Sequence, residues 1–134
     1  MPFQSSESLP KEERLTKRSE YLAVREDSMG LHSRSFILAY RNNDRPWSRL
    51  GITVTTKVGT AVVRNRIKRR AREFFRRNRQ LFPAGYDLVV IARLAAASMD
   101  HAAADAELRR LAERMKREAE RGPKRSETPA GRGP

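Results

Sequence analysis

Apolar and polar residues alternate along two short stretches of the chain, residues 35–41 and 50–55. In the first stretch Phe36, Leu38 and Tyr40 fall on one side, as expected of a β-strand with one buried face. The second stretch alternates between large aliphatic residues and Gly or Thr. The Asn, Asp and Pro residues between the two stretches favour a turn. We therefore predict two strands joined as a hairpin.

Between residues 60 and 81 the pattern changes to a helical period. Apolar side chains recur every three or four positions, which predicts an amphipathic helix. Thr60 is placed to cap its N-terminus, and Pro83 and Gly85 bring it to an end. The stripe that we expect to face a core consists of Val63, Ile67, Ala71, Phe74, Asn78 and Leu81.

Three further elements complete the predicted fold. Thr16 is placed to cap a short helix that runs to about Arg25. Residues 86–92 are nearly all apolar, as in a strand buried on both faces. A last helix begins near Ser98 or Asp100 and carries apolar residues at helical spacing. The order helix, strands, helix, strand, helix predicts an α/β (α+β) two-layer sandwich, with helices packed on a small sheet.

The chain length fits a single domain. Its 134 residues are enough for one hydrophobic core and too few for two comfortable ones. We place the domain at residues 13–119. Residues 1–12 and 120–134 are poor in periodic apolar positions and rich in Ser, Pro, Gly or charge, which predicts disordered tails.

The charge balance narrows the class of partner. Lys and Arg number 29 against 16 Asp and Glu, for a formal net charge of +13. Such a surface repels itself unless an anionic partner supplies counter-charge, and nucleic acid is the usual one. The chain has no cysteine, which fits a reducing compartment, and we expect it in the cytoplasm. No apolar run approaches the roughly 20 residues that cross a bilayer, so we expect no membrane association.

The basic residues concentrate on the predicted helix. Between residues 57 and 79 the single acid is Glu73, so a merely solvated face with balanced charge is the weaker interpretation. A helix lying on an anionic membrane is also weaker, because the apolar stripe continues into strand-like segments that need covering. Guanidinium groups suit a row of phosphates. We expect Phe74 and Phe75 in the core, and spacing divides Tyr21 evenly between core packing and RNA contact. The face opposite the apolar stripe carries Asn65, Arg69, Arg72, Arg76 and Arg79.

Candidate catalytic groups are scattered. His32 and His101 lie far apart without ligand-like spacing, and no paired carboxylates suggest a two-metal nuclease site. We therefore predict no catalytic residue, no metal site and no small-molecule substrate for this chain.

Residues 64–69, which read RNRIKR, closely resemble the helix motif of the protein subunit of bacterial ribonuclease P. The resemblance includes the preceding Lys-Val-Gly, the following Arg-Glu at Arg72 and Glu73, the Leu-Gly-Ile that begins at Leu50, and Asp-Leu-Val-Val from Asp87. It extends from about Arg14 to Lys116. It implies a ribosomal protein S5 domain 2-like fold with a left-handed βαβ crossover around the basic helix, against the general right-handed rule. It also implies a ribonucleoprotein in which a large RNA, holding magnesium, removes the 5′ leader of precursor tRNA.

The resemblance assigns two surfaces. A first aromatic of the family falls on Tyr21, but the place of the second is taken by Arg25, and the strand aromatic falls on either Ala39 or Tyr40. Charge is therefore expected to outweigh stacking in the cleft. The implied RNA-binding residues are Lys57, Arg64, Asn65, Arg66, Lys68, Arg69, Arg72 and Arg76. The implied cleft for the leader of the precursor tRNA is lined by Tyr21, Arg25, Ile37, Ala39, Arg41, Thr53 and Thr55.

Two other functions fit the composition. A structural RNA-binding protein of ribosomal type, with no role in cleavage, would carry the same charge. A duplex-DNA reader is weaker, because base readout in the major groove uses varied polar side chains and this helix face is nearly all Arg.

Overall fold

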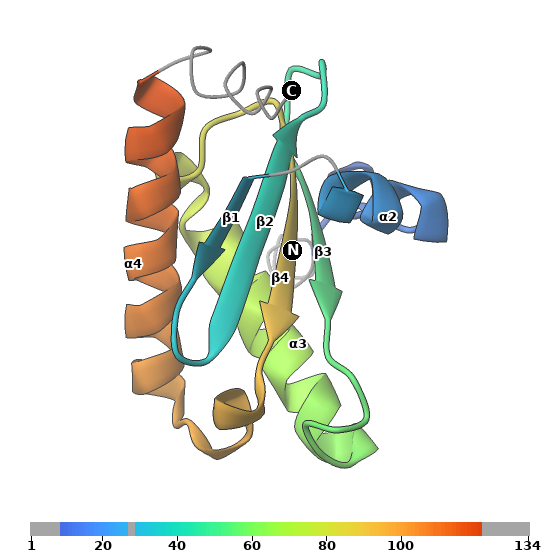
Figure 1. Ribbon diagram of the computed structural model, residues 1–134, viewed down its shortest axis with the longest axis vertical. Coiled ribbons are helices and arrows are strands. Elements are labelled where there is room, and N and C mark those ends of the chain that lie inside the picture. Colours follow the sequence, from blue (N-terminus) through green and yellow to red (C-terminus); the bar gives the residue numbers. More distant parts are fainter. Residues whose placement is uncertain (1–8, 27–28, 122–134) are drawn as a thin grey trace, which may run out of the picture.

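A mixed four-stranded sheet forms the centre of the computed structural model, which describes residues 9–26 and 29–121 (Figure 1). Its strand order is β1-β2-β4-β3. β1 pairs with β2 and β2 with β4 in antiparallel fashion, whereas β3 and β4 are parallel. The bounds are β1 Met29–His32, β2 Phe36–Asn42, β3 Arg49–Thr53 and β4 Tyr86–Ala92.

The predicted hairpin of β2 and β3 is wrong. β4 lies between these strands, so that Val90 faces Leu38 on one side and Ile52 on the other. Alternation identifies which residues share a face, but it does not identify the neighbouring strand. The nearly continuous apolar sequence of β4 suits the central place that it takes. β1, which the sequence pattern did not predict, occupies the opposite edge beside β2.

Two long helices cover one face of the sheet, and a short helix lies on the other (Figure 1). α3 connects the parallel strands β3 and β4 through a left-handed crossover, as the resemblance implied. The predicted α/β fold is confirmed. The α-helices are α2 Arg18–Glu26, α3 Ala61–Arg77 and α4 His101–Glu120, and the 3-10 helices are η1 Lys11–Glu13, η2 Arg79–Leu81 and η3 Leu94–Ser98.

The ends of the long helices follow the predicted capping chemistry. The side chain of Thr60 accepts the N–H of Val63 at 3.3 Å, and Asp100 accepts the N–H of Ala103 at 2.8 Å. Each cap satisfies a backbone donor that the first helical turn leaves free. α3 ends at Arg77, earlier than the predicted basic helix, so Arg79 falls in the separate turn η2.

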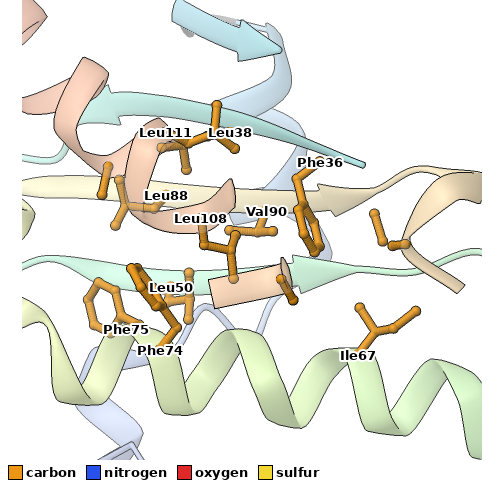
Figure 2. Close-up of a cluster of buried hydrophobic side chains, with 14 of the residues drawn as sticks. Phe36, Leu38, Leu50, Ile67, Phe74, Phe75, Leu88, Val90, Leu108 and Leu111 are labelled. Carbon is orange, nitrogen blue, oxygen red and sulfur yellow. The ribbon is translucent and has the colours of Figure 1, made fainter. Parts of the chain in front are cut away.

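The main core lies between the sheet and the two long helices (Figure 2). The predicted stripe of α3 is confirmed at Ile67, Ala71 and Phe74, which are buried. Phe75 is buried as well, because α4 covers a second side of α3 and widens the buried sector. Both phenylalanines pack against the ring of Phe82, at centroid distances of 6.2 and 5.0 Å. Neither ring is available to stack on a base.

The N-terminal boundary of the domain differs from the prediction. Leu9 is only 3% exposed and belongs to the main core. Trp47 donates its indole N–H to the carbonyl oxygen of Glu12 at 2.8 Å. Residues 9–12 therefore pack on the domain and are not part of a tail. At the other end, α4 includes Glu120 and Arg121 is its C-cap, so the helix reaches into the predicted C-terminal tail. The remaining parts of the two predicted tails, residues 1–8 and 122–134, lie outside the described residues.

Two buried carboxylates tie separate elements together. Glu107 of α4 accepts hydrogen bonds from the hydroxyl of Ser33 and from the backbone N–H of Ser35, so it anchors the turn between β1 and β2. Asp87 of β4 accepts hydrogen bonds from Arg49 at 2.8 and 2.7 Å. Burial raises the pKa of each carboxyl, but these donors outweigh it, and both pKa values lie below the ordinary range.

Stability is expected to fall in acid. Because the pKa values of Asp87 and Glu107 are lowered by folding, their contribution is complete above the unfolded-state values and is lost as the pH falls through the folded-state values. The urea midpoint should therefore decrease below about pH 4. Urea titrations between pH 7 and pH 2.5 would measure it. The variant Glu107→Gln should show a shallower decrease, and equal slopes in the two proteins would contradict this assignment.

Candidate nucleic-acid interface

The outward face of α3 carries side chains that no acid neutralises. Within residues 9–26 and 29–121, no hydrogen bond or ion pair to another side chain is formed by Asn65, Lys68, Arg69, Arg72 or Arg77. From Asn65 to Arg77 this surface extends about 18 Å along the helix. Guanidinium and ammonium groups held in this way are available to phosphates. We call Asn65, Lys68, Arg69, Arg72 and Arg77 the free face of α3.

Three other arginines of the helix donate to backbone carbonyls. Arg64 reaches Gly59 at 3.2 Å, and Arg66 reaches Ala97 at 3.3 Å. Arg70 donates to the carbonyl oxygen of Met99 at 3.0 Å. The bonds of Arg66 and Arg70 hold α3 against the segment that precedes α4, whereas the bond of Arg64 stays within the loop that leads into α3. Since a guanidinium has five N–H donors, Arg64 and Arg66 retain donors for RNA.

Two predicted members of the basic face are placed differently. Arg79, outside the helix, pairs with Glu13 at 2.8 Å and is therefore partly neutralised. Arg76 is half-buried, and its Nε is enclosed without a hydrogen-bond partner in the part of the chain that the structure describes. The helical wheel places Arg76 opposite the stripe, but the wide buried sector of α3 reaches it.

Lys57 lines a hollow at the end of the sheet, just before α3. The hollow has a volume of about 660 Å³, and Arg34 and Arg93 contribute further cations from two other segments. The sequence did not point to either of them. Arg34 lies between β1 and β2 and Arg93 follows β4, so they come near Lys57 only in the folded chain. Thr55, predicted for the cleft, lies beyond the end of β3 and lines this hollow.

Tyr21 of α2 lies across the backbone of β3. Its hydroxyl donates to the carbonyl oxygen of Leu15 at 3.3 Å, and its ring packs so closely on Gly51 that a Cβ there would lie 2.6 Å from Cε2. Tyr21 is half-buried and packs against the cluster formed by Leu15, Val24, Ala39 and Val89. The ring therefore belongs to the α2 contact and keeps a solvent-accessible part.

The variant Gly51→Ala is expected to displace the Tyr21 ring. A contact of 2.6 Å is too short for two carbons, so the ring or α2 must move. We expect a loss of about 1–3 kcal/mol of stability, as for other overpacked sites. Urea denaturation would measure it. Gly30→Ala is the matched control, because a Cβ there meets nothing closer than 3.8 Å. Equal losses in the two variants would show that the contact with Tyr21 is not the cause.

Only part of the predicted cleft is open. Ile37 and Thr53 face Ile91 of β4 from its two sides, and all three are half-buried on the sheet face that carries α2. Ala39, predicted to line the cleft, is 5% exposed beneath α2 and is closed to a ligand. Ile91 was missed, because a nearly all-apolar strand does not reveal which of its residues remain open.

The margins of this cleft are basic. Arg25 is exposed on α2, and Arg41 is half-buried beside Asp87 in the neighbouring strand. Tyr40, the other candidate for a strand aromatic, is 4% exposed on the opposite face of the sheet, where its ring meets Tyr86 edge-on at 5.8 Å. Among the cleft residues that the structure describes, Tyr21 is thus the single aromatic. We call this surface the sheet cleft, after the cleft that the family resemblance implies; it consists of Tyr21, Arg25, Ile37, Arg41, Thr53 and Ile91.

An ion-pair network joins α2 to the sheet at this cleft. Arg49 of β3 bonds Asp87 through two nitrogens and also contacts Glu20 of α2 at 3.0 Å. Asn43 donates to the same Asp87 at 2.9 Å. Burial raises the pKa of Glu20, but the N–H groups of Lys17 and Thr16 and the Arg49 charge outweigh it and lower that pKa.

Residues 9–26 and 29–121 contain no group of three or more His, Asp or Glu side chains arranged to hold a metal ion. In the described part of the chain, no helix is long and apolar enough to cross a membrane.

A family model and two relatives show which known proteins this chain is similar to. The family model described as Ribonuclease P matches residues 9–116. The ribonuclease P protein component of Syntrophus aciditrophicus (strain SB) is 44% identical over 95 residues, which cover 71% of this chain and 80% of the relative. That of Thermotoga maritima is 42% identical over 88 residues, covering 66% and 75%.

Solved structures agree with these relatives. The Thermotoga maritima RNase P protein superposes with a TM-score of 0.71 at 37% identity, covering 76% of this chain and 96% of that protein. The Staphylococcus aureus RNase P protein gives a TM-score of 0.70 at 31% identity, covering 73% and 90%. Both are similar to this chain over nearly their whole length.

Proposed function

Because this chain belongs to the ribonuclease P protein family, we propose that the free face of α3 binds the ribonuclease P RNA and that the sheet cleft binds the 5′ leader of precursor tRNA. As a member of this family, the protein assists a catalytic RNA in the 5′ processing of tRNA, and the RNA carries out the chemistry. This sets aside the ribosomal alternative and the duplex-DNA reader.

The free face of α3 is the observation that carries the first assignment. Its side chains have no internal partner among the described residues, whereas Arg64, Arg66 and Arg70 of the same helix donate to backbone carbonyls. Each phosphate that such a cation neutralises releases counterions. Shielding of phosphates allows two polyanions, the catalytic RNA and the precursor tRNA, to approach each other.

The sheet cleft supports the second assignment. Its floor of half-buried aliphatic residues, one partly open aromatic ring and basic margins suit an unpaired RNA strand. With Tyr21 as its single described aromatic, the cleft relies on Arg25 and Arg41 for much of its affinity. This arrangement favours little preference among bases, since contacts to phosphates do not read sequence.

Magnesium and location complete the proposal. We place the magnesium of the reaction mainly on the RNA partner, in keeping with the division of labour in the family. We place the protein in the cytoplasm, where precursor tRNA is processed in bacteria and where a chain without cysteine is at no disadvantage.

Cleavage of a 5′-extended precursor tRNA tests the proposal. Single-turnover rates would be measured with a bacterial ribonuclease P RNA at low magnesium, with and without this protein. We expect strong stimulation by the wild-type chain and little by the variant in which Arg64, Arg66 and Lys68 are all replaced by Ala. A folded protein that gave no stimulation with its cognate RNA would refute the proposal.

A further inference from the structure

Helix α2 depends on its contacts with the sheet for its position. It has nine residues, and an isolated helix of that length is unstable in water. The apolar cluster that it shares with the sheet is small: Leu15 and Val24 pack on Ala39 and Val89, with Tyr21 and Ile91 at the margin. Apolar packing of this size holds the helix on the sheet, but it is not directional and does not set the tilt or register of the helix. Hydrogen bonds and ion pairs must set them.

Both carboxylate oxygens of Glu20 accept hydrogen bonds. Oε1 accepts the backbone N–H groups of Thr16 and Lys17, each at 3.0 Å, which closes the first turn of α2. Oε2 accepts Nη1 of Arg49 at 3.0 Å. The predicted cap, the side chain of Thr16, is thus replaced by a carboxylate three residues inside the helix. One side chain both begins the helix and attaches it to β3.

Arg49 is itself held rigidly. Its Nε and Nη2 bond the two carboxylate oxygens of Asp87 at 2.8 and 2.7 Å, in the parallel fork geometry that fixes a guanidinium. The Arg49 side chain is 13% exposed and that of Glu20 is 22% exposed, so water screens this pair less than a surface pair. Among the described residues, it is the one ion pair between α2 and the sheet.

The same contact sets the aromatic wall of the sheet cleft. Glu20 and Tyr21 are neighbours on α2, and their partners Arg49 and Gly51 are two residues apart on β3, hence on the same face. A shift of the helix at Glu20 therefore moves the Tyr21 ring along β3. Arg25 lies one turn further along α2 and moves with it.

We propose that Glu20 is a positioning residue for the RNA leader: by holding α2 on Arg49, it keeps Tyr21 and Arg25 at the sheet cleft. The inference rests on the proposed leader-binding role of the cleft. It assigns Glu20 no contact with RNA, which a carboxylate would repel. Its effect should therefore appear only when a leader is present, whereas a role in general stability would affect every measurement alike.

The variant Glu20→Gln tests the inference. It retains an oxygen for the N–H groups of Thr16 and Lys17 but removes the charge that Arg49 holds. The matched control is Glu13→Gln, which makes the same charge change at the exposed pair with Arg79. Each protein, assembled with ribonuclease P RNA, would be titrated with precursor tRNA bearing a five-nucleotide leader and with tRNA lacking one. We define the leader gain as the dissociation constant of the tRNA without a leader divided by that of the precursor tRNA with one.

We expect Glu20→Gln to reduce the leader gain by about fivefold or more, the smaller end of what one stacked base contributes. Its affinity for the RNA subunit should stay within about twofold of wild type, and Glu13→Gln should retain the full gain. An unchanged gain in folded Glu20→Gln, or an equal loss in Glu13→Gln or in subunit affinity, would overturn the inference. Absence of any gain in the wild-type protein would instead refute the proposed cleft. If circular dichroism shows that Glu20→Gln does not fold, Glu20→Asp is tested instead. It keeps the negative charge on a side chain one methylene shorter, and we expect the same reduction of the leader gain.

Discussion

Replacement of Lys68, Arg69 and Arg72 by alanine is expected to weaken binding of the ribonuclease P RNA and to flatten its salt dependence. Each of these side chains lies on the free face of α3 and has no internal partner in the part of the chain that the structure describes. Loss of three phosphate contacts should reduce the slope of log K against log salt concentration by about 2–3. Affinity for the RNA, measured between about 50 and 200 mM monovalent salt, gives this slope.

A second triple variant separates the surface from the net charge. Arg110, Lys116 and Arg117 are exposed on α4, and their replacement by alanine removes the same three positive charges. We expect this control to retain most of the affinity and slope. Equal losses in both variants would mean that total charge, and not the free face of α3, determines binding. Circular dichroism should show both proteins folded, since none of the six side chains belongs to the core.

Arg66 is a less selective probe than Arg72. The Arg66 guanidinium donates to the carbonyl oxygen of Ala97, so its removal also breaks a contact between α3 and η3. Arg72 is exposed and carries no such bond. An RNA-binding defect in Arg72→Ala can therefore be attributed to the loss of an RNA contact, because the substitution breaks no hydrogen bond within the described part of the protein.

The variant Asp87→Asn is expected to lose about 3 kcal/mol of unfolding free energy, a large share of the total for a domain of this size. Asp87 is 6% exposed and receives two bonds from Arg49 and one from Asn43. The amide leaves the Arg49 charge poorly paired in a mostly buried position, where desolvation is costly. Urea denaturation at pH 7 measures the loss.

The exposed ion pair of Arg79 with Glu13 provides the comparison. The Arg79 side chain is 47% exposed, so Glu13→Gln should cost less than about 1 kcal/mol. Asp87→Asn should also lose part of the acid sensitivity expected of the wild type, because the carboxyl with the lowered pKa is gone. A cost for Asp87→Asn no larger than that of Glu13→Gln would show that the Arg49 network contributes little to stability.

Much of the candidate site could be predicted because its signals are local. The helical period around Ile67, the caps at Thr60 and Asp100 and the concentration of arginine on α3 are each set within a few residues of sequence. Local backbone bonding and side-chain direction determine them, so they persist in the fold. The RNRIKR segment also carried the family resemblance, which matched proteins at more than 40% identity confirm.

The predictions from sequence were wrong where contacts between distant segments determine strand pairing or burial. The pairing of β2 with β4 rather than β3 brings together residues about 50 positions apart, and no alternation pattern encodes it. Leu9, Ala39 and Arg76 were each misjudged because their burial depends on which element packs above them. Arg34, Arg93 and Ile91 were missed for the same reason.

By itself, the sequence determined the fold class, the basic helix and the kind of partner, because hydrophobic period, capping and net charge are properties of short segments or of composition. Only the tertiary structure decided which arginines of α3 are free and which bind carbonyls, which part of the sheet face stays open beside α2, and how Glu20 reaches Arg49. These features depend on how side chains from separate elements lie relative to one another. The dense packing of the core between the elements fixes those relative positions.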